Sequence, residues 1–194
     1  MNWAIFAILS WFALGLDIGL ASAISPESSD VRPSFFIPLI VFVAMRAPHR
    51  TALWAGLLGG LMLDLIHPLP RESAADVIIP GPHAIGLMLS AQLVVALRSM
   101  VMHRNPLTTA VLAFITVVVA GVVAIALLTI RTLFGDGIDY APTHELLTLL
   151  GSALYTAVVA LLLAIPLGWF APVFSFGGHH ANPGRFAWSH ADRV

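Results

Sequence analysis

The stretch 51–66 contains two glycines and an aspartate that could form a contact surface for a second helix, with the carboxylate as its polar group. Gly56, Gly60 and Asp64 recur every four residues, so on a helix they fall within an arc of about 80° on one face. Glycines at that spacing let a second backbone approach closely, which is a main packing device in lipid. A carboxylate in the same stripe should face protein or water. The stripe predicts a docking groove for a partner's helix, or else packing inside this one chain with Asp64 hydrated near the membrane surface.

A second group of candidate residues lies at the start of the apolar stretch 83–101. The segment Pro80 to Pro82 precedes His83, and prolines before a first turn are typical of a helix entry. A neighbouring helix can cross closely at Gly86. We interpret His83 as a hydrated histidine at the membrane surface, with ligand binding as the alternative. Gly86 completes the predicted partner interface, which consists of Gly56, Gly60, Asp64 and Gly86.

The other reactive side chains lack the partners that chemistry needs. Asp17 is a further acid within an apolar stretch, and it could form a proton or cation relay with Asp64 or, as we favour, lie at a solvated helix end. Ser152 lacks the Gly-x-Ser-x-Gly context of a nucleophile. Adjacent His179 and His180 have no cysteine to complete a metal site. We therefore predict no catalytic residue, no metal ion and no cofactor.

Composition excludes several functional classes. The chain has no cysteine, and all nine basic residues are arginine, so thiolate chemistry, Schiff-base lysines and phosphate-binding lysines are absent. The net charge of -1 with no basic run gives no indication of nucleic-acid binding. Of 194 residues, 59% are hydrophobic and 10% are charged, with a mean hydropathy of +0.93. Soluble proteins carry about a quarter charged residues, so these values predict a membrane domain.

The candidate residues lie in apolar stretches long enough to meet a bilayer. Residues 107–130 form the clearest one, because a helix of that length reaches about 36 Å against a hydrocarbon core of about 30 Å. We predict an all-α integral membrane protein with one domain, residues 1–171, and a flexible cytoplasmic tail, residues 172–194. The second of its six transmembrane helices is short enough to be re-entrant. The helices are expected near residues 3–23, 32–46, 51–66, 83–101, 107–130 and 146–170.

The placement of arginine predicts the orientation in the membrane, because short loops rich in arginine stay in the cytoplasm. Arg46 and Arg50 lie between the second and third helices, and Arg98 and Arg104 flank the turn between the fourth and fifth. The tail holds two more, whereas each opposite loop holds one. No positive segment precedes the first apolar run, which favours an uncleaved anchor. We predict a bacterial inner-membrane protein with both termini in the cytoplasm.

Four motifs follow one another along residues 5–130 in an order that resembles a known family. They are Arg32-Pro33 before a short apolar helix, the arginine-bearing turn 46–50, Gly56-Leu57-Leu58-Gly59-Gly60-Leu61-Met62-Leu63-Asp64-Leu65, and Pro82-His83-Ala84-Ile85-Gly86. In this order they resemble the rod shape-determining MreD family of bacteria. The last helix and the tail match that family only in hydropathy, and the loop 67–82 is longer than the family's usual connection.

The resemblance implies a function and a fold. It implies a non-enzymatic scaffold of the cell-elongation machinery that builds peptidoglycan, docking an MreC-like bitopic protein beside a penicillin-binding transpeptidase and a RodA-type glycosyltransferase. The actin-like MreB filament would be contacted indirectly. It also implies a fold similar to the substrate-binding subunits (S-components) of energy-coupling-factor transporters. A vitamin-type uptake subunit is therefore the alternative function, although fold likeness alone does not transfer activity.

Overall fold

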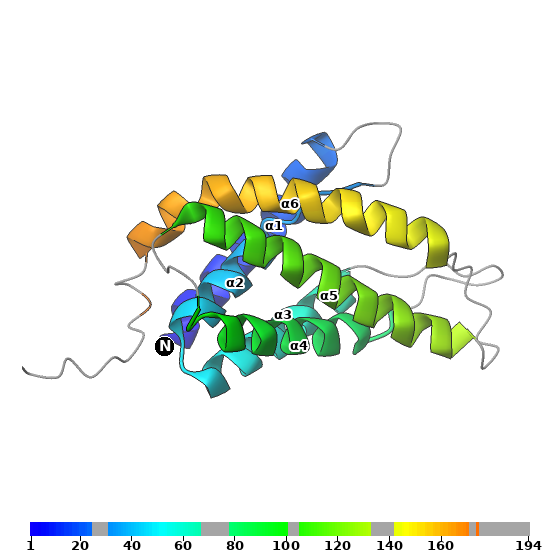
Figure 1. The fold of residues 1–194 in the computed structure, drawn as a ribbon, viewed down its shortest axis with the longest axis horizontal. Coiled ribbons are helices and arrows are strands. Elements are labelled where there is room, and N and C mark those ends of the chain that lie inside the picture. The colour runs from blue at the N-terminus through cyan, green and yellow to red at the C-terminus, as the bar shows by residue number, and fades with distance from the viewer. Residues whose placement is uncertain (25–30, 67–77, 101–104, 133–141, 171–173, 175–194) are drawn as a thin grey trace, which may run out of the picture.

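The protein folds as a bundle of helices that brings the first and last of them together at one end (Figure 1). The computed structural model describes residues 1–24, 31–66, 78–100, 105–132, 142–170 and 174. These residues form six helices and no strand, which confirms the prediction of an all-helical chain. The helices are α1 (Trp3–Ile24), α2 (Phe36–Arg46), α3 (His49–Ile66), α4 (Pro82–Leu97), α5 (Pro106–Thr132) and α6 (Pro142–Phe170).

Three of the helices are long and apolar enough to cross a bilayer. They contain the apolar spans Trp3–Leu20 of α1, Pro106–Arg131 of α5 and Thr143–Phe170 of α6. The helices α2 and α4 are apolar but shorter, with 11 and 16 residues. The chain is therefore a membrane protein by the length and composition of α1, α5 and α6. That all six helices cross the bilayer stays a prediction.

The short helix α2 lies at the centre of the bundle. Its residues Phe36 to Met45 are all buried, and it packs against all five other helices. At about 1.5 Å per residue it is only about 16 Å long. That length is about half of what a lipid-facing crossing needs. Because protein rather than lipid surrounds α2, its shortness exposes no backbone groups to hydrocarbon.

The remaining helices pack in chain order, α3 against α4, α4 against α5 and α5 against α6. Figure 1 shows α5 and α6 side by side along most of their length. Two clusters of buried side chains fill the interior. The first is mainly among α1, α2 and α3 with Leu87 of α4 and Ala120 of α5, and the second is mainly among α2, α4, α5 and α6 with Ala52 of α3. The largest fully buried side chains include Phe36, Ile40, Leu87 and Val94. Side chains thus occupy the centre of the bundle.

Two predicted boundaries need correction. The second helix begins at Phe36 rather than near residue 32, because the backbone before it binds side chains of other helices. The fourth helix ends at Leu97 rather than near residue 101. The predicted tail, residues 172–194, lies outside the described residues except for Phe174. This side chain is fully buried, and its backbone carbonyl accepts a hydrogen bond of 3.0 Å from Asn2, so the chain is held in place at this position.

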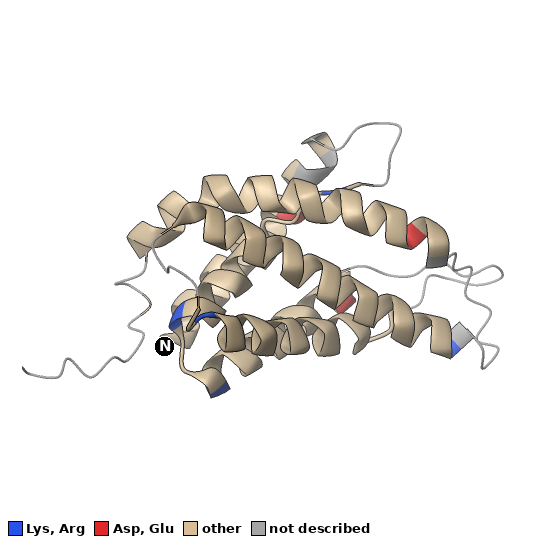
Figure 2. Cartoon of the chain, in the orientation of Figure 1, with Lys and Arg blue, Asp and Glu red and all other residues tan. Residues whose placement is uncertain are grey.

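Charged side chains are unevenly distributed along the bundle. Figure 2 shows a group of basic residues at the end that holds the N-terminus and further basic residues elsewhere, including the opposite end, whereas the acidic residues lie away from the N-terminal end. At the basic end Arg98 donates a hydrogen bond of 2.6 Å to the backbone carbonyl of Ala47, which joins the end of α4 to the turn between α2 and α3. The arginines that predict the cytoplasmic side, Arg46, Arg50 and Arg98, are thus on helix ends that meet.

Candidate functional site

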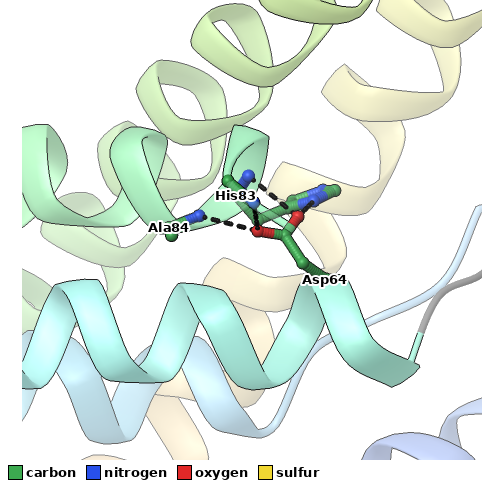
Figure 3. Close-up of polar contacts among 4 residues, drawn as sticks. Asp64, His83 and Ala84 are labelled. Carbon is green, nitrogen blue, oxygen red and sulfur yellow. Dashed lines mark hydrogen bonds and ion pairs between the residues drawn. The ribbon is translucent and has the colours of Figure 1, made fainter. Parts of the chain in front are cut away.

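Asp64, in the last turn of α3, binds the first turn of α4 (Figure 3). Its Oδ1 accepts hydrogen bonds from the backbone N–H of His83 at 3.0 Å and from His83 Nδ1 at 2.7 Å. Its Oδ2 accepts from the backbone N–H of Gly81 at 2.8 Å and of Ala84 at 3.2 Å. Asp64 is only 3% exposed. The carboxylate therefore caps a neighbouring helix instead of facing water.

Gly81 and Pro82 make the start of α4 suitable for capping by Asp64. The first N–H groups of a helix have no partner within the helix, and the helix dipole favours a negative charge there. Pro82 at the first position has no N–H to satisfy. Gly81 adopts a positive φ of 129°, which side-chain-bearing residues rarely adopt. The chain thus turns sharply at Gly81 and presents the free N–H groups to Asp64.

The glycines of the predicted stripe are the surface on which α4 lies. A Cβ built at Gly60 would lie 2.3 Å from the backbone oxygen of His83, and one at Gly56 would lie 2.8 Å from that of Leu87. A Cβ at Gly86 would lie 2.5 Å from the backbone oxygen of Ala120 on α5. No real side chain fits at such distances. All three glycines therefore permit close backbone approach between helices of this chain.

The predicted partner interface is corrected accordingly. Gly56, Gly60 and Asp64 face α4, and Gly86 faces α5, so helices of the same chain already occupy this surface. The alternative of packing inside one chain is the one that the structure supports. The detail of a hydrated Asp64 is wrong, because its oxygens bind backbone N–H groups in a buried position.

Asp17 forms a second cap of the same kind, which the sequence did not reveal. Its Oδ2 accepts from Ser34 Oγ at 3.0 Å, and its Oδ1 accepts from the backbone N–H of Phe35, the residue before α2. Ser34 Oγ in turn accepts a hydrogen bond of 3.3 Å from the N–H of Ile37 in the first turn of α2. Asp17 is thus a structural acid at the start of α2, rather than a solvated helix end. The proton relay with Asp64 stays without support, since each acid is engaged by a different helix.

Side chains of α6 hold the segment before α2. Ser152 Oγ accepts a hydrogen bond of 3.1 Å from the N–H of Arg32, and Thr156 Oγ1 accepts one of 3.0 Å from the N–H of Ser34. These two positions lie four residues apart and so share one face of α6. The hydroxyls satisfy backbone groups that would otherwise be unpaired beside apolar helices. Ser152 therefore has a structural use in the described fold.

The pair formed by His83 and Asp64 is also an arrangement found in acid–base catalysis, so its surroundings matter. The side chain of His83 is 39% exposed, whereas that of Asp64 is 2% exposed. Both Asp64 oxygens bind backbone N–H groups, which ties the carboxylate to helix capping. Within the described ranges no group of three His, Cys, Asp or Glu side chains could hold a metal ion. His179, His180 and His190 lie outside those ranges.

The fold and these contacts define a class: a helical membrane protein in which two short helices are each capped by an acid of the preceding helix. Comparisons with protein-family models, curated proteins and solved structures give no match for this chain. The resemblance to MreD proteins and to energy-coupling-factor subunits therefore depends on the sequence motifs alone. Function must be argued from contacts in the bundle.

Proposed function

We propose that this chain is a non-enzymatic scaffold of the bacterial cell-elongation machinery, which holds the transmembrane helix of an MreC-like bitopic protein. The motifs that carry the resemblance to MreD lie where helices begin or where two helices pack closely. Arg32-Pro33 precedes the entry into α2, Gly56 to Leu65 form the α3 surface beneath α4, and Pro82 to Gly86 open α4. The resemblance thus concerns how the helices are joined, and this supports a common architecture with that family.

The filled centre of the bundle favours a scaffold over an uptake subunit. A vitamin-binding subunit needs a cavity with polar side chains that orient its ligand. Here apolar side chains with less than 2% exposure, among them Phe36, Ile40 and Leu87, occupy the space around α2. The hydroxyl of Ser90 donates to the backbone carbonyls of Gly86 and Thr116, so it joins α4 to α5 and is not available to a ligand. A rigid interior of this kind suits a protein that offers its outer surface to partners.

The observation that carries the proposal is the uncovered outer face of α1. This helix packs mainly against α2 and leaves Trp11 80% exposed and Phe12 64% exposed. A Cβ built at Gly15 meets no atom within 4 Å, whereas one built at Gly56, Gly60, Gly86, Gly121 or Gly151 would lie within 3 Å of a neighbouring atom. Gly19 follows four residues later, at the spacing that favours close helix pairing in lipid. We place the MreC-like helix on this face, in place of the α3 stripe.

The other partners follow from that contact. A bitopic partner bound to α1 would carry the scaffold to the penicillin-binding transpeptidase and the RodA-type glycosyltransferase on the outer side. The end with Arg46, Arg50 and Arg98 would face the cytoplasm, because basic residues favour that side. Both termini would then be cytoplasmic, and MreB would be reached indirectly. The membrane would be the bacterial inner membrane.

Co-purification of the full chain with the MreC-like protein of the same genome tests the proposal. Gly15→Leu should reduce the recovered partner about tenfold, because overpacking a contact by about 1.4 kcal/mol has that effect. Ala126→Leu is the matched control, since Ala126 is an exposed small residue on α5. Full recovery with Gly15→Leu would remove α1 as the contact. No recovery with the native chain would overturn the scaffold function.

A further inference from the structure

A groove opens at the arginine-rich end of the bundle, where the end of α2, the start of α5 and the last turns of α6 meet. It has a volume of about 310 Å³. A Cβ built at Gly168 on α6 meets no atom within 4 Å, so this wall of the groove borders open space. The walls are mainly apolar, and the polar side chains among them are Arg46, Asn105 and Thr109. Its lining residues are Phe42, Met45, Arg46, Asn105, Pro106, Thr109, Ala164, Ile165 and Gly168.

Arg46 provides a positive charge to this groove. Its guanidinium carbon lies 4.5 Å from the centroid of the Phe42 ring, and the side chain is exposed. Stacking on an aromatic face leaves the N–H groups in the guanidinium plane free to donate. Among the described residues none forms an ion pair or hydrogen bond with Arg46, whereas Arg98 at the same end donates to Ala47. Arg46 is therefore available for an external anion.

Asn105 supplies a further donor to the same groove. Its Oδ1 accepts a hydrogen bond of 3.0 Å from the backbone N–H of Leu107, so the amide oxygen is used to cap α5. The amide NH₂ group has two N–H donors. Asn105 and Arg46 both line the groove. An anion with several oxygens, such as a phosphate group, matches a guanidinium with a neighbouring amide.

Besides Trp11, three exposed tryptophans lie near helix ends at the arginine-rich end of the bundle. Trp3 begins α1, Trp169 lies one residue before the end of α6, and Trp54 is in the second turn of α3, all three being exposed. The hydrogen bond from Asn2 to Phe174 brings the start of α1 to the end of α6. Tryptophan is enriched where hydrocarbon meets headgroups. The groove thus lies at the membrane–water interface on the arginine-rich side.

We propose that this groove binds one anionic phospholipid of the adjacent leaflet. The phosphate lies against Arg46 and Asn105, and an acyl chain lies along Ile165 and Gly168. The apolar walls favour a lipid over free phosphate, and the volume is that of a small-molecule site rather than of a helix about 10 Å wide. No residue of α1 lines this site, and the site does not depend on the proposed scaffold function.

Native mass spectrometry of the full chain, with phosphatidylglycerol or phosphatidylcholine of the same acyl chains, tests this site. The native chain should retain phosphatidylglycerol about tenfold better, because the quaternary ammonium of phosphatidylcholine offsets its phosphate charge and is repelled by Arg46. Arg46→Gln should abolish the preference. Arg50→Gln is the matched control, because Arg50 is exposed at the same end but does not line the groove.

A second variant tests the apolar wall independently of the charge. Gly168→Leu adds volume where the structure has open space, so the fold stays intact and both lipids should bind several-fold less. Equal retention of the two lipids by the native chain would overturn the proposal, as would an unchanged preference in Arg46→Gln. Loss of the preference on adding millimolar inorganic phosphate would identify a free-phosphate site instead.

Discussion

Replacing Asp64 by asparagine tests whether this residue stabilises the fold by capping α4. The two side chains have the same shape, so the packing of α3 against α4 is retained. Asparagine has one acceptor oxygen where aspartate has two, and its NH₂ group would face N–H donors. Either the pair of bonds from His83 or the pair from Gly81 and Ala84 would therefore be lost. The negative charge at the start of α4 would also disappear.

The expected size of the effect follows from those two lost bonds. A hydrogen bond to a charged group contributes about 1.5–3 kcal/mol, so the lower value gives a total loss of about 3 kcal/mol. Burial increases the loss of stability, because Asp64 is 3% exposed and water cannot easily replace the lost acceptor. For a chain of this size the loss corresponds to a fall in Tm of about 6–12 °C.

Thermal unfolding of the full chain in detergent, followed by size-exclusion chromatography of the heated samples, measures this fall. Glu145→Gln is the control, because Glu145 is an exposed acid in the first turn of α6 and its loss should change stability by less than about 0.5 kcal/mol. Equal Tm values for Asp64→Asn and the native chain would refute the capping argument. A fall as large in Glu145→Gln would show that total charge, and not the cap, is responsible.

Three further predictions test the packing, the second cap and the orientation. Gly60→Leu should prevent recovery of a monodisperse protein in detergent, because its Cβ would lie 2.3 Å from a backbone oxygen, whereas Gly15→Leu should remain monodisperse. Asp17→Asn should lower the free energy of unfolding by about 1.5–3 kcal/mol in the same thermal assay, since it removes an acceptor at the start of α2. A membrane-impermeant maleimide should label Glu145→Cys in intact cells and Ser99→Cys only after lysis; the chain has no native cysteine, and the reverse pattern would invert the proposed orientation.

Helix positions were largely predictable because apolar runs in this chain end at prolines or arginines. The first, fifth and sixth helices lie within a few residues of their expected ranges. The predicted start of α2 was wrong, because Pro33 just before an apolar run is typical of a helix entry. The backbone of residues 32–35 instead binds Asp17, Ser152 and Thr156, which lie far away in the sequence. No local pattern reports such distant acceptors.

The glycine stripe shows a second limit on what can be predicted from the sequence, namely which helix packs against it. Its spacing identifies the face of α3 where a second backbone can approach, and the structure confirms close approach at Gly56 and Gly60. Spacing does not state which backbone approaches. Here that backbone is α4, which follows in the same chain after a long connection. The identity of the neighbour depends on tertiary packing, so the predicted use of the stripe by a partner was wrong although the predicted geometry was right.

The two capping acids explain how short helices can exist inside a membrane bundle. A helix that begins within the apolar layer leaves its first N–H groups without water, at a cost of several kcal/mol for each. Asp17 and Asp64 remove that cost at the starts of α2 and α4. Each acid lies on the helix that precedes the helix it caps, Asp64 in the last turn of α3 and Asp17 two turns before the end of α1, so each pair of helices is joined by a side chain as well as by a loop. A neutral replacement at both positions should therefore destabilise the two pairs independently, with additive losses, because the acids share no partner among the described residues.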